Sequence, residues 1–243
     1  MKAICEMIKY QYKQYMMSAK WVMPLIVLLG ILGMMYSTPP VWIVDGFSIT
    51  GIFLFVVMVW VGETIQEVEP EVSEQVMILR LKSERKYYLC HIIFMMCICV
   101  VVTGISIVVP VFIHIWSGNA LLSRQLVWSD FVGGGLLMSA CSFIGGMVGE
   151  LFHMRVMKNR KAGIGLTFFI ALLAVCRNGV IAKFATMKYI LWVIPPISDV
   201  ISWVTNESYF NMREVMRGFI LLLIYGAVMA VMKVELLRKV KFG

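Results

Sequence analysis

Side chains that could do chemistry gather in one polar segment of the chain, residues 63–86. Glu63 and Glu67 are four residues apart, which on a helix places both carboxylates on one face, as general acid–base chemistry requires. The pair lies at the expected end of an apolar stretch, where two glutamates are more typical of solvated charge. The sequence therefore predicts no catalytic pair here.

Motifs for other common chemistries are absent from the sequence. It contains no glycine-rich phosphate loop followed by Lys-Ser/Thr and no Gly-x-Ser-x-Gly nucleophile. His91, His114 and His153 are scattered, without the spacing of a zinc enzyme. Cys97 and Cys99 fall on different faces of a helix and suit no shared metal. We expect no catalytic, cofactor-binding or metal-binding residue, and no enzymatic activity of the chain itself.

Six long apolar stretches dominate the sequence. They are residues 21–37, 41–62, 88–116, 131–152, 163–182 and 215–234. Each can cross a hydrocarbon core about 30 Å thick at about 1.5 Å per helical residue. Hydrophobic residues make up 60% of the chain, against about 45–50% in soluble domains. Because lipid cannot hydrogen-bond exposed backbone, we predict an all-α membrane protein with six transmembrane helices in a single domain, residues 1–243.

The basic residues predict the orientation. Four segments of the chain carry four lysines or arginines each, which leaves six of the 22 elsewhere. The four groups are Lys2, Lys9, Lys13 and Lys20; Arg80, Lys82, Arg85 and Lys86; Arg155, Lys158, Arg160 and Lys161; and Lys233, Arg238, Lys239 and Lys241. By the positive-inside rule both termini are expected to be cytoplasmic. The net charge of +8 is then a signal of topology and gives no reason to expect nucleic acid as a partner.

Three segments between the spans have a pattern of their own. In residues 1–20 lysines fall on one helical face and apolar residues on another, which predicts an interfacial helix; the alternative is a continuation of the first span. Residues 63–87 form a cytoplasmic segment in which Pro70 precedes a short amphipathic helix. Residues 189–204 contain two apolar pieces broken by Pro195-Pro196, which predict a re-entrant or interfacial helical hairpin in the outer leaflet.

Small residues recur at helical spacing in the fourth stretch. Among them are Gly135, Ser139, Gly145 and Gly149, and the last two form a GxxxG pattern. Such residues let helices approach closely, either within one bundle or at a subunit interface. Glu150 follows them, and Arg155 is its expected partner.

Few ionisable side chains fall within the apolar stretches. Asp45, Glu150, Arg177 and Arg217 all lie toward their ends. Ion-coupled carriers usually keep charged sites near the bilayer midplane. Energy for any transport is therefore expected to come from a separate subunit.

The order of these elements resembles the integral membrane subunits of ABC-2 type transporters. The shared plan is an interfacial elbow helix, six spans with both ends inside, a charged coupling segment after the second span and an outer hairpin before the sixth. A motif of that family before the third span is matched by Ser83 and Leu89, with Arg85 one place beyond the usual arginine. The family's proline, glycine and lysine are replaced by Leu81, Cys90 and His91.

The resemblance implies partners for this chain. A separate ABC ATPase, present in two copies and carrying ATP and Mg, would receive the coupling helix, and a second permease, identical or homologous, would complete the path. The coupling residues implied are Glu74, Met77, Ile78, Arg80, Leu81, Lys82 and Arg85. The charged members would set the register, and Met77, Ile78 and Leu81 would act as apolar anchors.

The function expected from this resemblance is that of the permease subunit of an ATP-driven ABC exporter in the membrane of a bacterial cell. Its cargo is expected to be hydrophobic or amphipathic, such as an antimicrobial peptide, a drug or a lipid, and its role resistance or immunity. Two alternatives stay open: a membrane anchor or sensor subunit of an ATPase complex, and a membrane-embedded enzyme. The sequence leaves open the cargo, the direction of movement and the identity of the second permease.

Overall fold

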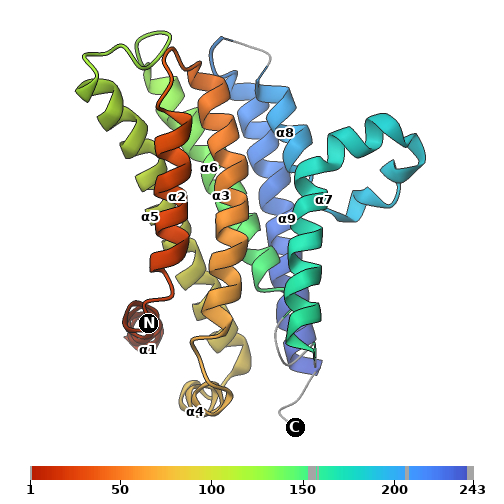
Figure 1. Ribbon diagram of the computed structural model, residues 1–243. Helices are drawn as coiled ribbons and strands as arrows, with labels where there is room; N and C mark the ends of the chain where they lie inside the picture. Colours follow the sequence, from red (N-terminus) through yellow and green to blue (C-terminus); the bar gives the residue numbers. More distant parts are fainter. Residues whose placement is uncertain (1, 153–156, 158, 206–207, 240–243) are drawn as a thin grey trace.

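The computed structural model describes residues 2–152, 157, 159–205 and 208–239 of this chain, and 81% of these residues are helical (Figure 1). No strand occurs among the described residues, where Val41 and Leu122 form one isolated bridge. The α-helices are α1 (Lys2–Met17), α2 (Val22–Met35), α3 (Ile43–Gln66), α4 (Glu71–Leu81), α5 (Glu84–Trp116), α6 (Trp128–Gly149), α7 (Arg160–Lys183), α8 (Ile197–Val204) and α9 (Met212–Lys239). Two 3-10 turns, Ala185–Lys188 and Leu191–Val193, precede α8. The predicted all-helical class is confirmed.

Five helices in the described part of the chain, α3, α5, α6, α7 and α9, are long and apolar enough to cross a membrane. A sixth crossing is obtained if α1 and α2 count as one span with a bend of 75°. The first predicted span, 21–37, contains only the 14 residues of α2, about 21 Å of helix. The chain is therefore compatible with a multi-pass membrane protein of five to six crossings.

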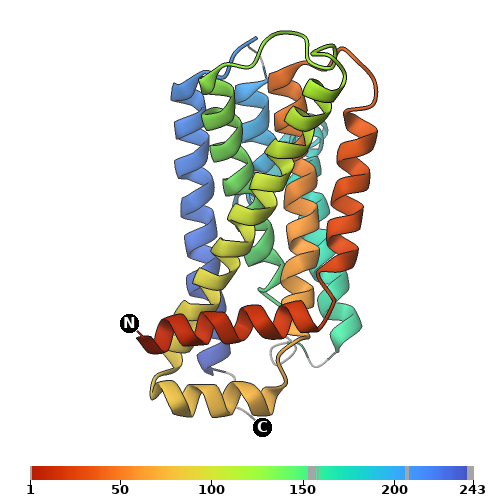
Figure 2. The same ribbon diagram turned by 90° about the vertical axis from the view of Figure 1, so that its left-hand side faces the viewer.

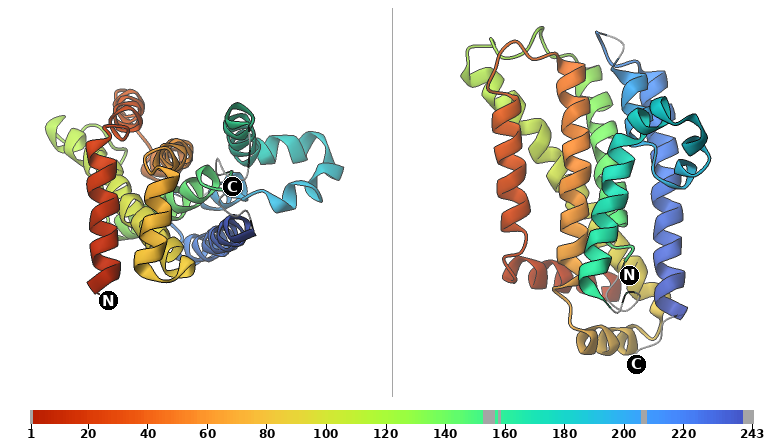
Figure 3. Two further views of the ribbon diagram at one scale, coloured as in Figure 1. Left: turned by 90° about the horizontal axis from the view of Figure 1, so that it is seen from below. Right: turned by 45° about the vertical axis from the view of Figure 1, so that its right-hand side comes forward.

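Two short helices close one end of the bundle, which we call the α4 end. Figure 2 shows α1 and α4 lying across this end, nearly at right angles to the long helices, and Figure 3 shows them side by side from below. The last turns of α9 reach the same end (Figure 1). The Tyr10 and Ser73 hydroxyls, 2.9 Å apart, join α1 to α4. The interfacial position of α1 stays a prediction.

The core is centred on the contact between α3 and α6. Gly145 and Gly149 of α6 lie so close to α3 that an added Cβ would collide with the carbonyl oxygens of Phe55 and Val59 respectively. Gly62 of α3 is held in the same way, because its Cβ would lie 2.6 Å from the oxygen of Gly146. Backbone therefore packs directly on backbone along this seam, which only glycine permits.

The polar segment 63–87 is divided among three helices rather than forming one unit. Its first residues continue α3 to Gln66, Pro70 precedes α4, and α5 already begins at Glu84. Lys82 has a left-handed backbone (φ 53°) and ends α4, and the Ser83 side chain accepts a hydrogen bond from the Lys86 amide at the start of α5. A left-handed residue and an N-cap in succession stop one helix and start the next.

Residues 189–204 lie at the other end of the bundle and have two different halves (Figure 3). The side chains of Tyr189, Ile190, Trp192 and Val193 are exposed, and the Trp192 carbonyl accepts a hydrogen bond from the Tyr225 hydroxyl of α9 at 2.7 Å. The second half is α8, whose apolar face is buried, and its Asp199 pairs with Arg177 of α7 at 3.3 Å. The predicted outer-leaflet position of this segment stays a prediction.

The glycine seam can be tested by substitution. Gly149→Ala is expected to lower the free energy of unfolding by about 1–3 kcal/mol, because its methyl group would overlap the Val59 carbonyl. Gly165→Ala in α7 is the matched control, since its Cβ would meet nothing within 4 Å. Thermal unfolding in detergent, followed with a thiol-reactive dye that detects exposure of the buried Cys90, Cys99 and Cys141, measures both. Equal midpoints for the two variants would contradict the close approach.

Candidate functional site

The α4 helix is the most distinctive surface element at its end of the bundle. It connects α3 to α5 and lies beyond their ends, outside the part of the chain that is apolar enough for a membrane. Figure 2 shows it as the outermost element of this end, below α1. A partner molecule approaching this end would therefore meet α4.

One face of α4 packs against the bundle. Met77, Ile78 and Leu81 contact a small apolar cluster formed by Met7, Tyr87, Tyr88, Cys90 and Leu237. Glu74 is buried on the same face and accepts a long hydrogen bond, 3.5 Å, from the Tyr88 hydroxyl. Four of the seven coupling residues predicted from the sequence thus hold α4 in place rather than pointing outward.

The opposite face of α4 carries an exposed apolar stripe. Val72, Val76 and Leu79 occur at helical spacing, and 71%, 54% and 76% of their surfaces are exposed. Arg80 and Lys82 lie exposed beside them, and Arg85 is exposed on the first turn of α5. The three basic members of the predicted set are therefore available for contact. The exposed apolar side chains are Val72, Val76 and Leu79, whereas the sequence named Met77, Ile78 and Leu81 as the apolar anchors.

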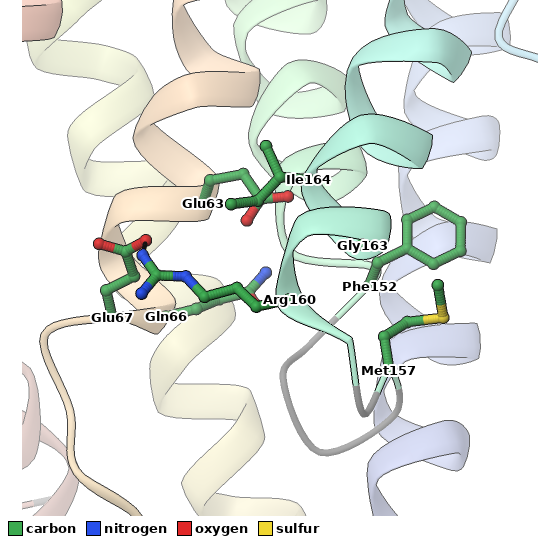
Figure 4. Close-up of a pocket in the computed structure, with 8 residues that line it drawn as sticks. All are labelled: Glu63, Gln66, Glu67, Phe152, Met157, Arg160, Gly163 and Ile164. Atoms are coloured by element: carbon green, nitrogen blue, oxygen red, sulfur yellow. Dashed lines mark ion pairs between the residues drawn. The ribbon is translucent and has the colours of Figure 1, made fainter.

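A charge cluster joins three helix ends at the same end of the bundle. Glu67, just after α3, receives the Lys20 ammonium at 2.9 Å and the Arg160 guanidinium. Figure 4 shows Arg160 at the start of α7 reaching across to the Glu67 carboxylate, with Glu63 one turn above. Two cationic side chains thus share the single Glu67 carboxylate. Burial lowers the pKa of Lys20, and the nearby Arg160 charge lowers it by a smaller amount.

The space beside this cluster is too small for a substrate. The cavity lined by Glu63, Gln66, Glu67 and Arg160 has a volume of only about 10 Å³, roughly the room of one water molecule. Glu67 is engaged by two cations, and Glu63 is not part of an ion pair among the described residues. The arrangement ties α2, α3 and α7 together electrostatically.

Glu150, just after α6, has different partners from the one expected. Its carboxylate accepts a hydrogen bond from the Lys233 ammonium of α9 at 2.6 Å and lies 3.0 Å from Nδ1 of His91 on α5. Arg155, the predicted partner, lies outside the described residues. Sequence reasoning counted Lys233 among the solvated topology charges, although it is buried. The one available signal was Glu150 itself, because a carboxylate next to an apolar helix requires a partner.

A larger cavity, about 250 Å³, opens where α1 meets α2. Four helices line it, with Leu28 of α2, Val57 of α3 and Phe94 and Ile98 of α5 along its wall. Tyr12, Tyr15 and Trp21 supply the polar tips among its lining residues, and no charged side chain takes part. This cavity suits an apolar group.

The small residues singled out in α6 serve different contacts. Gly145 and Gly149 pack on α3 within the chain. Gly135 and Ser139 are half-buried and lie about three and two turns before Gly145. A Cβ on Gly135 would lie 3.4 Å from Ile107 of α5, and the Ser139 hydroxyl donates to the Leu136 carbonyl. A subunit interface at these positions stays a prediction.

No group of three or more His, Cys, Asp or Glu side chains in the described part of the chain could hold a metal ion. Comparison with protein-family models, with curated proteins and with solved structures finds no match to this chain. The function must therefore be argued from the geometry and from the plan of the chain.

The two faces of α4 predict different effects of the same substitution. Leu81→Ser is expected to lower the free energy of unfolding by about 1–2 kcal/mol, because the side chain packs on the apolar cluster. Leu79→Ser should change it by less than about 0.5 kcal/mol, because that side chain is exposed. The midpoints of thermal unfolding measure the difference. A larger loss for Leu79→Ser would show that the faces of α4 are reversed.

Proposed function

We propose that this chain is the membrane-spanning subunit of an ATP-driven exporter of the ABC-2 type, which receives work from a separate ATPase through α4. The observation that carries the proposal is the exposed stripe of Val72, Val76 and Leu79 on a helix whose other face is anchored. Three exposed apolar side chains at helical spacing on a short surface helix are typical of a helix that binds a groove.

The contact would combine apolar burial with weaker ionic guidance. Burying a valine or leucine side chain fully contributes about 1.5–3 kcal/mol, so the stripe supplies most of the affinity. Arg80, Lys82 and Arg85 surround it with positive charge, each contributing about 0–1 kcal/mol to an exposed pair. An apolar groove with an acidic rim is therefore the partner surface that fits α4.

The attachments of α4 suit it to transmit force. Short connections, residues 67–70 and 82–83, join α4 to the end of α3 and to the start of α5. The contact between the Tyr10 and Ser73 hydroxyls joins α4 to α1. Movement of α4 would pull on α1, α3 and α5 together. ATP and Mg would be held by the ATPase, two copies of which would act on two membrane subunits.

The positions of the basic residues support a cytoplasmic α4 end. Lys9, Lys13, Arg80, Lys82 and Arg238 all belong to elements of this end, in line with the positive-inside rule. Both termini would then be cytoplasmic and the chain a multi-pass protein of the cell membrane. The projecting segment before α8 would lie toward the outer leaflet.

The cavity between α1, α2, α3 and α5 favours a hydrophobic or amphipathic cargo. Its wall is apolar, and it belongs to the elements that α4 would move. A peptide, drug or lipid fits this chemistry better than a sugar or an ion. A second permease, identical or homologous, would complete the path.

Docking can be tested with the ATPase encoded nearest to this chain's gene. Replacing Val72, Val76 and Leu79 together by serine is expected to reduce ATP hydrolysis stimulated by this chain at least tenfold, because the apolar contact is lost. The matched control replaces Val127, Ile190 and Val193 by serine, three exposed apolar side chains at the other end of the bundle. ATPase activity and cargo flux in vesicles are the two measurements.

Each outcome of that experiment has a defined meaning. Loss of both activities in the stripe variant alone supports the exporter. Equal stimulation by the stripe variant and the wild type would overturn docking through α4. ATP turnover without flux for any apolar cargo would instead indicate an anchor or sensor subunit, and product formation without an ATPase an embedded enzyme.

The orientation has its own test in intact cells. In a background without native cysteines, Ala120→Cys between α5 and α6 is expected to react with a membrane-impermeant maleimide, whereas Gln75→Cys on α4 should react only after the cells are opened. Both positions are exposed in the fold, so access depends on the side of the membrane alone. Labelling of position 75 from outside would refute the cytoplasmic assignment.

A further inference from the structure

Three ionisable side chains from three helices meet in the interior near the α4 end. Glu150 follows α6, His91 belongs to α5 and Lys233 to α9, and their side chains are 0%, 12% and 4% exposed. Lys233 Nζ lies 2.6 Å from Glu150 Oε2 and 3.4 Å from His91 Nδ1, and His91 Nδ1 lies 3.0 Å from Glu150 Oε1. The proposed contact of α4 with an ATPase does not include these three side chains.

His91 Nδ1 can form a hydrogen bond with Glu150 only if this nitrogen carries a proton. This nitrogen lies between a carboxylate oxygen, which can only accept, and an ammonium group, which can only donate. Glu150 Oε1 has no other hydrogen-bond partner among the described residues, and His91 Nδ1 lies 3.0 Å from it. A proton on Nδ1 therefore completes the coordination of the buried carboxylate.

Two small polar cavities border His91. One, about 20 Å³, is lined by Gln66, Glu69, Tyr88 and Lys233 among others, and the second, about 10 Å³, by Gln11, Gln14 and Glu69. Each has roughly the room of a single water molecule. Gln11 is 5% exposed, and neither atom of its amide finds a partner in the described chain; nor does Gln66 Oε1. Buried amides of this kind require water, which would give a proton a path to His91.

The charges around His91 favour an added positive charge. The titratable groups that face it or its partners come from the segment after α3, from α1, α4, α5 and α9, and from the end of α6. They are Tyr15, Glu69, Glu74, Tyr87, Tyr88, Cys99, Glu150 and Lys233. At neutral pH these comprise three carboxylates and one ammonium. A second proton on His91 reduces this excess of negative charge and makes the hydrogen bond to Glu150 charge-assisted. Repulsion between the protonated ring and the Lys233 ammonium opposes these two effects.

We propose that His91, Glu150 and Lys233 form a buried proton-binding site, and that proton binding holds α5 against α6 and α9. One turn earlier on α5, Tyr88 donates a hydrogen bond to Glu74 of α4, and Tyr87 donates one to Glu69 in the connection between α3 and α4. The site thus links proton concentration at the α4 end to the position of α4. It stands apart from the proposed ATPase contact, because it requires no partner.

The first test measures thermal unfolding of the purified chain across the range in which histidine changes charge, about pH 5 to 8. The wild type is expected to unfold about 2–4 °C higher at about pH 6 than at about pH 8, because proton binding stabilises the contacts of Glu150. His91→Gln should abolish this difference. The matched control is His114→Gln on the same helix: His114 is also buried, but its Nδ1 accepts from the Leu122 amide.

The results of this test discriminate clearly. A pH difference lost in His91→Gln and kept in His114→Gln supports the site. A wild type without the difference, a difference of the opposite sign, or a His91→Gln variant that keeps it would overturn the proposal.

A second measurement covers the case in which His91→Gln does not fold. The chain has three histidines, so ¹⁵N-histidine labelling gives a readable NMR spectrum, with His114→Gln and His153→Gln used for assignment. The His91 ring is expected to carry a proton on Nδ1 and to bind a second proton on Nε2 when the pH is lowered. A ring that stays neutral throughout, with its proton on either nitrogen, would overturn the proposal. Neither experiment involves an ATPase, so the outcome is independent of the proposed function.

Discussion

The bundle depends on the close approach of α3 and α6. Gly145 and Gly149 of α6 and Gly62 of α3 have no side chain at the points of closest approach, so the two backbones touch there. Apolar side chains gain little by leaving lipid for another helix, and dispersion between closely packed atoms carries more of the association. The other helices pack around this pair: Met95 of α5 fits against Gly146, and Phe143 of α6 fits against Gly226 of α9.

Ionic contacts at the helix ends complement this apolar seam. Apolar packing alone allows neighbouring helices to slide past each other, whereas hydrogen-bonded charges have fixed partners and directions. At the α4 end Glu67 and Glu150 each gather two basic groups from other helices. At the opposite end Arg124 donates two hydrogen bonds to the buried Asp130, at 2.7 and 2.8 Å, and the hydrogen bond raises the pKa of Arg124. The clusters around Glu67 and Glu150 therefore join α3 to α7, and α6 to α5 and α9.

The functional proposal depends on the division of α4 into two faces. A docking helix must be held firmly on one side and left apolar on the other, and α4 has both properties. The sequence contains two apolar sets on this helix, Val72–Val76–Leu79 and Met77–Ile78–Leu81. Periodicity gives their spacing but cannot say which set the bundle covers. That assignment came from contacts with Tyr87, Tyr88 and Leu237, which are distant along the chain or belong to another helix.

Local sequence patterns were enough to predict the helical class, five of the six apolar stretches as long helices, and the break at Pro70. These features follow from local composition: apolar length, helical periodicity and a missing amide donor. Only the tertiary structure decided that Glu150 pairs with Lys233 and His91, and that α2 is a short helix bent against α1. It also decided which glycines touch α3. The ion pairs and the glycine contacts join groups separated by tens of residues, so their distances are set by how the helices pack and not by any spacing along the chain.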